Sequence, residues 1–158
     1  MPDLNRCVLD TSVIIKALFS PSRKTAGTAY TREATTHRSC VALLAALDEH
    51  GIEVILPRCG IVEIAAVGAR LSTSRASVEI CGEVETSYTL VPEERIIGIA
   101  KTIALQEKCP CFDTYFIALA EMDTVPLFTD DRGMHGICCR RKIQSWLIRD
   151  SDIASIFS

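Results

Sequence analysis

The stretch Cys7–Leu18, C-V-L-D-T-S-V-I-I-K-A-L, decides the fold because it joins a short buried strand directly to an apolar helix. Its first three residues are aliphatic or small and predict a strand, while the closely spaced apolar residues from Val13 onward predict a helix. Asp10 is the only charge from Cys7 to Ile15. It is followed by Thr11 and Ser12 at the carboxyl end of that strand, where open α/β sheets bind their ligands. The same residue types are common helix N-caps, so the stretch alone leaves capping and ligand binding open.

Short strands and helices alternate along the rest of the chain. The expected strands are 7–9, 53–56, 88–91, 125–129 and 143–148, and the expected helices are 13–19, about 41–50, 58–71, 75–85, 92–108 and 113–122, with a packed tail at 153–157. Residues 20–37 are polar and aperiodic and predict a surface insertion, a loop with at most a short helix, and 109–112 predict a connection. The alternation predicts an α/β fold: a single domain over 1–158, with a mostly parallel central sheet of about four to five strands and helices on both faces.

The bulk composition fits a globular protein with its own core. The chain has 158 residues, 48% of them hydrophobic and 23% charged, and a formal net charge of −3. Its N-terminus, M-P-D-L-N-R, lacks the basic segment and apolar core of a signal peptide, and no apolar run is long enough for a membrane span, so we expect a cytoplasmic protein. The negative charge means that a polyanion would have to be bound through local patches or cations.

The eight cysteines are spread through apolar segments and do not form the C-x-x-C pairs typical of structural zinc sites, which favours a role as small core residues. The chain also holds one Asn and two Gln. Such scarcity of thermolabile amides indicates a hyperthermophilic source, with an archaeon expected, and intracellular disulfides do occur in these organisms. The sequence leaves the pairing of the cysteines open.

Four further acids occupy conspicuous positions. Glu63 is the only charge between Cys59 and Ala69, and Asp113 is the only charge between Cys109 and Ala120. Asp130 and Asp131 directly follow the strand P-L-F-T. Each has an ordinary alternative: Glu63 can extend from its helix into solvent, Asp113 can cap a helix, and the Asp pair can form a turn.

Together these acids predict a metal site. In a parallel sheet, Asp10 and Asp131 follow strands that end at one edge, where Asp113 and Glu63 can join them. Carboxylates that gather so closely require cations between them, and oxygen ligands without His or Cys favour Mg²⁺ or Mn²⁺. A pair of such ions is suited to phosphodiester hydrolysis. No general-base histidine is needed, and the three histidines are scattered along the chain.

The motifs V-L-D-T-S (8–12), I-V-E-I (61–64), F-D-T-Y-F-I-A-L-A-E (112–121) and P-L-F-T-D-D (126–131) resemble those of PIN-domain ribonucleases, especially the VapC-type toxins of VapBC toxin-antitoxin modules. The resemblance implies the metal-binding and catalytic quartet Asp10, Glu63, Asp113 and Asp131, with Asp130 as an accessory ligand and Ser12 and Thr129 as supporting hydroxyls. Three features depart from the family pattern: the long interval between the first two acids, the cysteine content and the doubled Asp.

The resemblance also implies the partners: a single-stranded or structured RNA substrate, an antitoxin whose C-terminal segment occupies the active-site groove, and a second copy in a homodimer. Arg132, Arg140 and Arg141 are candidates for holding the RNA backbone, with a solvated surface role as the alternative.

Two other functions stay open at this point. The first is a catalytically inactive PIN-like module that binds RNA or protein. The second is an acid-rich phosphatase or phosphotransferase, although Asp10 is followed by Thr-Ser rather than by the second nearby Asp that a nucleophile pair would suggest.

Overall fold

The computed structural model describes residues 4–21 and 27–158. The strands are β1 (Arg6–Leu9), β2 (Glu53–Pro57), β3 (Thr89–Val91), β4 (Leu127–Thr129) and β5 (Ser145–Leu147). The helices are α1 (Thr11–Leu18), α2 (Thr28–Glu49), α3 (Gly60–Leu71), α4 (Ser74–Ser87), α5 (Ile97–Glu107), α6 (Cys111–Asp123), α7 (Arg132–Arg140) and α8 (Ile153–Ile156), with 3-10 turns η1 (Glu93–Arg95) and η2 (Ile148–Asp150).

The five strands form one parallel sheet in the order β3-β2-β1-β4-β5. Val8 at the centre pairs with Ile55 of β2 and with Leu127 of β4. Along the chain, β2 and β3 are added on one side of β1, and β4 and β5 are then added on its other side. The carboxyl ends of β1 and β4 therefore flank the crevice where such sheets bind ligands.

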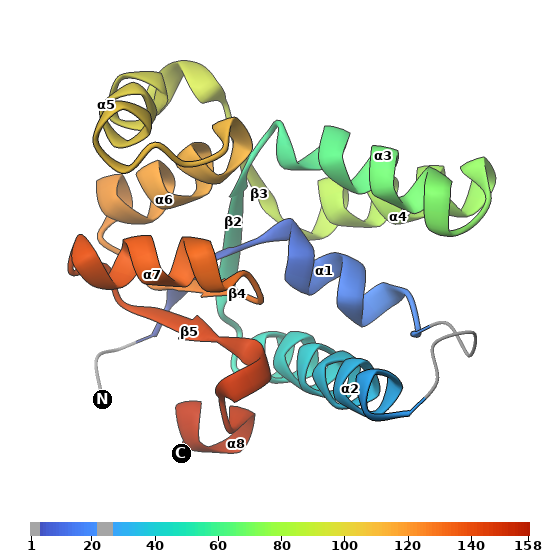
Figure 1. The fold of residues 1–158 in the computed structure, drawn as a ribbon. Helices are drawn as coiled ribbons and strands as arrows, with labels where there is room; N and C mark the ends of the chain where they lie inside the picture. The colour runs from blue at the N-terminus through green and yellow to red at the C-terminus, as the bar shows by residue number, and fades with distance from the viewer. Residues whose placement is uncertain (1–3, 22–26) are drawn as a thin grey trace.

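Helices cover both faces of this sheet, as the right-handed crossovers of parallel strands require. Figure 1 shows α5, α6 and α7 on one side of the strands and α1 to α4 on the other. The sheet interior is apolar: Cys7, Val8 and Leu9 of β1 are fully buried, and they belong to a single hydrophobic cluster that includes Phe116 of α6 and Phe128 of β4. The expected α/β sandwich is confirmed.

Some boundaries differ from the sequence prediction. Residues 28–37, predicted to be part of a loop insertion, form the first half of the long helix α2, while 22–26 lie outside the described residues. Thr36 of this half is buried, and His37 Nδ1 donates a hydrogen bond to the carbonyl oxygen of Lys16 at 2.6 Å, so tertiary packing stabilises a helix whose sequence has almost no apolar periodicity. Residues 109–112 are likewise not all connection, because α6 begins at Cys111.

The sequence prediction missed α7. Its nine residues, R-G-M-H-G-I-C-C-R, include two glycines, which disfavour a helix. Three of the nine, Met134, Ile137 and Cys138, are buried, and their packing stabilises the helix. All eight cysteines lie in the described part of the chain and are free thiols. Within the same residues, no helix is both long and apolar enough to cross a bilayer.

Candidate metal centre at the carboxyl edge of the sheet

Asp10 lies between β1 and α1 and is only 4% exposed. Two hydroxyls donate hydrogen bonds to its Oδ2 atom: Ser12 Oγ from the first turn of α1, and Thr129 Oγ1 from the end of β4 at 2.6 Å. The pKa of Asp10 is raised, chiefly because the carboxylate is buried. The charge of Glu63 also raises this pKa, whereas the hydrogen bonds from Ser12 and Thr129 lower it. Ser12 and Thr129 thus hold the buried carboxylate in place.

Glu63 reaches the same edge from the first turn of α3. The fully buried Thr11 donates a 2.6 Å hydrogen bond from Oγ1 to Glu63 Oε2, so neighbouring residues of α1 hold two of the four acids. Helices α1, α3 and α6 approach closely here because α3 begins with a glycine. A Cβ on Gly60 would lie 3.1 Å from Leu56 Cδ1 and 3.2 Å from both Phe116 Cζ and Thr11 Cγ2.

Asp113 stands in the first turn of α6 and is partly buried. Its pKa is raised to about 6, first by burial and then by the negative charges of Asp10, Asp131 and Glu63. Among the described residues, no side chain or amide donates a hydrogen bond to this carboxylate. The structure therefore places Asp113 within electrostatic reach of the other three predicted acids, and Asp113 is the least compensated of the four.

Asp131 is exposed and caps α7, because its Oδ1 atom accepts a 2.8 Å hydrogen bond from the backbone N–H of Met134. Its own N–H donates to Thr129 Oγ1 at 2.9 Å. The Thr129 hydroxyl is thus shared between the first and the fourth acid, and it fixes the position of β4 relative to β1.

Asp130 has a different environment from its neighbour. Its side chain is fully buried and forms ion pairs with Lys16 of α1 and Arg149 of η2. Burial acts to raise the pKa of Asp130, but hydrogen bonds from Arg149 and Lys16 outweigh it and lower the pKa. Two cations already neutralise this carboxylate, so the structure does not favour the accessory-ligand role predicted for Asp130.

Sequence reasoning overlooked three side chains around the site: Thr11, Lys16 and Arg149. Thr11 could have been found, because it stands between Asp10 and Ser12 in the motif. Lys16 carried a weaker signal as the single basic residue of an apolar helix. Arg149 follows the last strand, and nothing in its local sequence indicates a partner 19 residues earlier.

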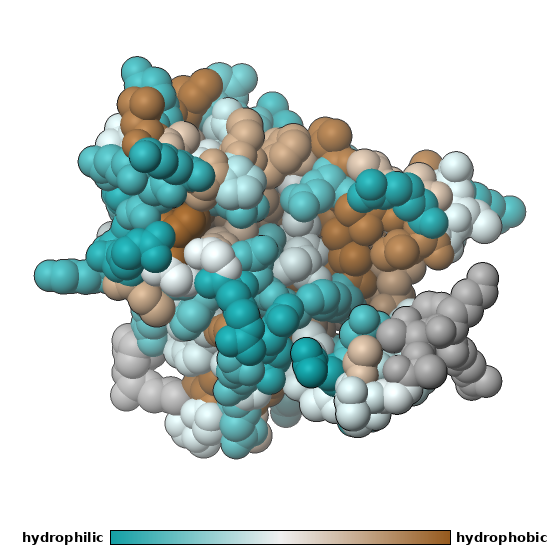
Figure 2. Space-filling view, in the orientation of Figure 1, coloured by the Kyte–Doolittle hydropathy of each residue, from teal (hydrophilic) through white to brown (hydrophobic). Residues whose placement is uncertain are grey.

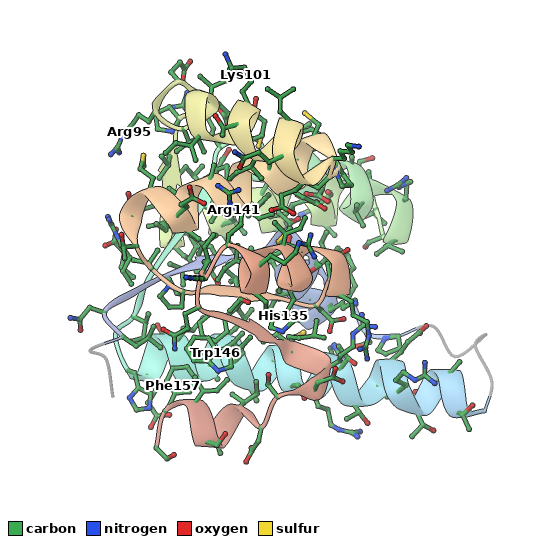
Figure 3. All side chains as sticks on the ribbon, turned by 60° about the vertical axis from the view of Figure 1, so that its left-hand side comes forward. Arg95, Lys101, His135, Arg141, Trp146 and Phe157 are labelled. Carbon is green, nitrogen blue, oxygen red and sulfur yellow. The ribbon has the colours of Figure 1, made fainter. Side chains whose placement is uncertain are left out.

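The three arginines proposed to hold RNA are all ion-paired. Arg140 binds Glu107 of α5, and Arg141 donates two hydrogen bonds to Glu121 of α6. Figure 3 shows Arg141 directed toward α5 and α6, at the end of α7 opposite Asp131. Arg140 and Arg141 thus stand at the carboxyl end of α7, whereas Asp131 caps its amino end. Arg132, beside Asp131, pairs with Asp150 while remaining 66% exposed.

A cavity of about 870 Å³ adjoins the site on the α1 and α2 side. Its walls include apolar side chains and the cations Lys16, Arg32 and Arg149. Figure 2 shows apolar side chains gathered where α1 and α3 face each other, and Leu18 and Leu71 are exposed on these helices. The cavity thus combines apolar side chains with three cations and with the acids Glu33 and Asp130.

The donor set suits a hard divalent cation. The four acids offer only oxygen atoms, and each stands before or within the first turn of a helix. In the part of the chain that the structure describes, no three Asp, Glu, His or Cys side chains are close enough together to form a ready coordination sphere. Glu63 and Asp131 instead direct an oxygen to Thr11 and to the amide of Met134. The residues fit Mg²⁺ or Mn²⁺ by their chemistry, and binding requires these side chains to draw together.

Comparisons with known proteins give similarity at the level of the fold. No protein-family model and no curated protein matches the sequence. Among solved structures, one of FitAB bound to an IR36 DNA fragment matches with a TM-score of 0.60 and 19% identity, covering 92% of this chain and 97% of that one. FitAcB from Neisseria gonorrhoeae matches with a TM-score of 0.55 and 18% identity, covering 89% and 96%. These matches confirm the PIN-like α/β sandwich.

Proposed function

We propose that this chain is a metal-dependent endoribonuclease of the PIN-domain type that acts as the toxin of a VapC-like toxin-antitoxin pair. The observation that carries the proposal is the environment of Asp113, whose pKa is raised to about 6 by burial and by the charges of three other acids from separate helices. A fold that only needed helix caps would not gather four carboxylates at one edge. Cations that bind between the carboxylates would offset their mutual repulsion, so the cluster is best explained as a metal site.

The proposed ligands are Asp10, Glu63, Asp113 and Asp131, with Mg²⁺ or Mn²⁺ as the cation. When bound, a pair of such ions would neutralise the scissile phosphate, lower the pKa of the attacking water and offset the charge of the leaving oxygen. Asp130 is left out of the ligand set because Lys16 and Arg149 already neutralise it.

The chain's own residues would orient this chemistry. Ser12 and Thr129 hold Asp10 through its Oδ2 atom, and Thr11 holds Glu63 through Oε2. The N-termini of α1, α3, α6 and α7 carry partial positive charge and favour a phosphate in front of them. Arg132, exposed at the start of α7, is the best placed of the three predicted arginines to contact the RNA backbone.

The cavity between α1 and α2 is the proposed docking site of the antitoxin. A peptide with apolar and acidic side chains would match the apolar walls and the exposed cation Arg32, whereas Lys16 and Arg149 are already paired with Asp130. The FitAB structure of similar fold was solved with DNA, which agrees with a partner that binds DNA. The proposed homodimer would cover exposed apolar residues such as Ile97 and Leu105 of α5.

The test is RNA cleavage by the purified chain and its variants in Mn²⁺ and in EDTA. We expect Mn²⁺-dependent cleavage that falls about a hundredfold or more in D10N and D113N, with the fold intact by circular dichroism. The control is D48N, which removes an exposed carboxylate near the end of α2, ahead of the amino end of β2. Equal cleavage by wild type and D113N would reveal a contaminating nuclease. RNA binding without cleavage would instead support an inactive RNA-binding module.

A further inference from the structure

Four hydrogen bonds join Arg149 to Asp130. Arg149 donates to Asp130 Oδ1 from Nε at 2.9 Å and from its backbone N–H at 3.1 Å. Its Nη2 atom donates to Asp130 Oδ2 at 2.8 Å and to the Asp130 carbonyl oxygen at 2.7 Å. Lys16 pairs with Oδ2 as well. One buried side chain thus connects three segments: α1, the turn after β4, and η2.

The turn that Asp130 anchors also carries the candidate ligands. The N–H of Asp130 donates to Ser12 Oγ at 3.2 Å, and Ser12 in turn donates to Asp10. Thr129, on one side of Asp130, donates to Asp10, and Asp131, on the other side, caps α7. A displacement of Asp130 would therefore move both Asp131 and the hydroxyls that hold Asp10.

We infer that Arg149 is a positioning residue, which acts through Asp130 to hold the 129–131 turn so that Asp131 faces the other three acids. The expected effect on metal binding rests on the proposed function. The expected effect on the position of the 129–131 turn rests only on the contacts of Arg149. Lys16 has a supporting role, since it makes a single contact to one oxygen and is 41% exposed. A point charge fixes the turn less well than the planar guanidinium, which binds both carboxylate oxygens and the carbonyl.

The chain offers a matched control. Arg141 also binds a carboxylate through two nitrogens, at 2.7 and 3.1 Å to Glu121, but at the far end of α7. Loss of either arginine removes a bidentate pair, whereas only loss of Arg149 should affect the candidate metal site. A purely structural role would make R149Q and R141Q similar in every measurement.

The experiment compares R149Q, R149K and R141Q by Mn²⁺ titration, by RNA cleavage and by amide hydrogen exchange of Asp131 and Met134. For R149Q we expect about tenfold weaker Mn²⁺ binding and a kcat lower by a similar factor with an unchanged KM, because outer contacts of metal ligands typically contribute this much. The Asp131 and Met134 amides, bonded to Thr129 and to the Asp131 carboxylate, should exchange faster without metal. R149K should recover part of each property, and R141Q should match wild type in Mn²⁺ affinity and in amide exchange.

The inference is overturned if folded R149Q retains wild-type exchange at both amides or wild-type Mn²⁺ affinity, or if R141Q shows the same losses. Should R149Q not fold, R149K alone decides by the same comparison with R141Q. D131N separates this question from the proposed function. If D131N binds Mn²⁺ as well as wild type, the metal site is wrongly assigned, while the exchange data still judge the role of Arg149.

Discussion

Removing the charge of Asp113 should stabilise the protein in the absence of metal while lowering the proposed RNA cleavage about a hundredfold or more. The pKa of Asp113 is raised from 3.8 to about 6. A difference of about two pKa units corresponds to roughly 3 kcal/mol of folded-state penalty for the ionised carboxylate. Because Asp113 is only partly buried, solvent screening reduces this to an expected gain of about 1–2 kcal/mol in D113N. For a chain of this size the gain equals a rise in Tm of about 3–6 °C.

The sign of the pH dependence follows from the raised pKa. Between about pH 4 and 6 the folded state binds a proton at Asp113 that the unfolded chain releases, so the wild-type free energy of unfolding falls as pH rises through this window. D113N lacks this titration. Its advantage over wild type should therefore be full at pH 7–8 and shrink toward zero near pH 4.

Urea unfolding of wild type, D113N and D48N in EDTA, at pH 4, 6 and 8, provides the measurement. D48N should stay within about 0.5 kcal/mol of wild type at each pH, as surface substitutions usually do. Saturating Mn²⁺ should reverse the order, because a ligand at 100 times its Kd stabilises wild type by about 2.7 kcal/mol. A D113N protein that is less stable than wild type at pH 8 in EDTA would refute the view that Asp113 is a strained member of an acidic cluster.

Three further results are expected. T129V should lose about 2–3 kcal/mol in urea unfolding, because the buried hydroxyl serves both Asp10 Oδ2 and the Asp131 amide; a loss below 0.5 kcal/mol would contradict this. G60A should lose about 1–3 kcal/mol because its Cβ would crowd Leu56, Phe116 and Thr11, whereas G98A, with open space around its Cβ, should gain up to about 1 kcal/mol; equal effects would refute the packing argument. In thiol labelling of the native protein, followed by peptide mass spectrometry, the exposed Cys111 and Cys139 should react rapidly. The buried Cys7, Cys40 and Cys138 should react only on unfolding, because burial raises the pKa of each of these thiols to about 12.

The sheet and its edge could be predicted from sequence because β1 and β4 contain apolar runs and are followed directly by acidic residues. That pattern identified Asp10 and Asp131, and the isolated charges identified Glu63 and Asp113. Helix α7 and the first half of α2 could not be predicted in this way, because their own sequences favour helix only weakly and packing against distant residues stabilises them.

The assignment of the doubled Asp also depended on tertiary structure. Asp130 and Asp131 are adjacent and chemically identical, and no local pattern separates them. The structure separates them through Lys16 and Arg149, which are 114 and 19 residues away from Asp130 in sequence. Long-range ion pairs of this kind leave no periodic signal, and the arginines at the end of α7 show the converse: basic residues that looked available are already paired.

The pairing of β1 with β4 has a consequence for the protein during its synthesis. The first and fourth acids lie just beyond the carboxyl ends of two paired strands, β1 and β4, yet their motifs are separated by more than a hundred residues. A growing polypeptide thus exposes the first carboxylate long before the last one leaves the ribosome, and contacts between such distant segments form late. A truncated or unfinished product would lack the assembled edge, so the proposed nuclease activity would arise only in molecules that have been made and folded through Asp131.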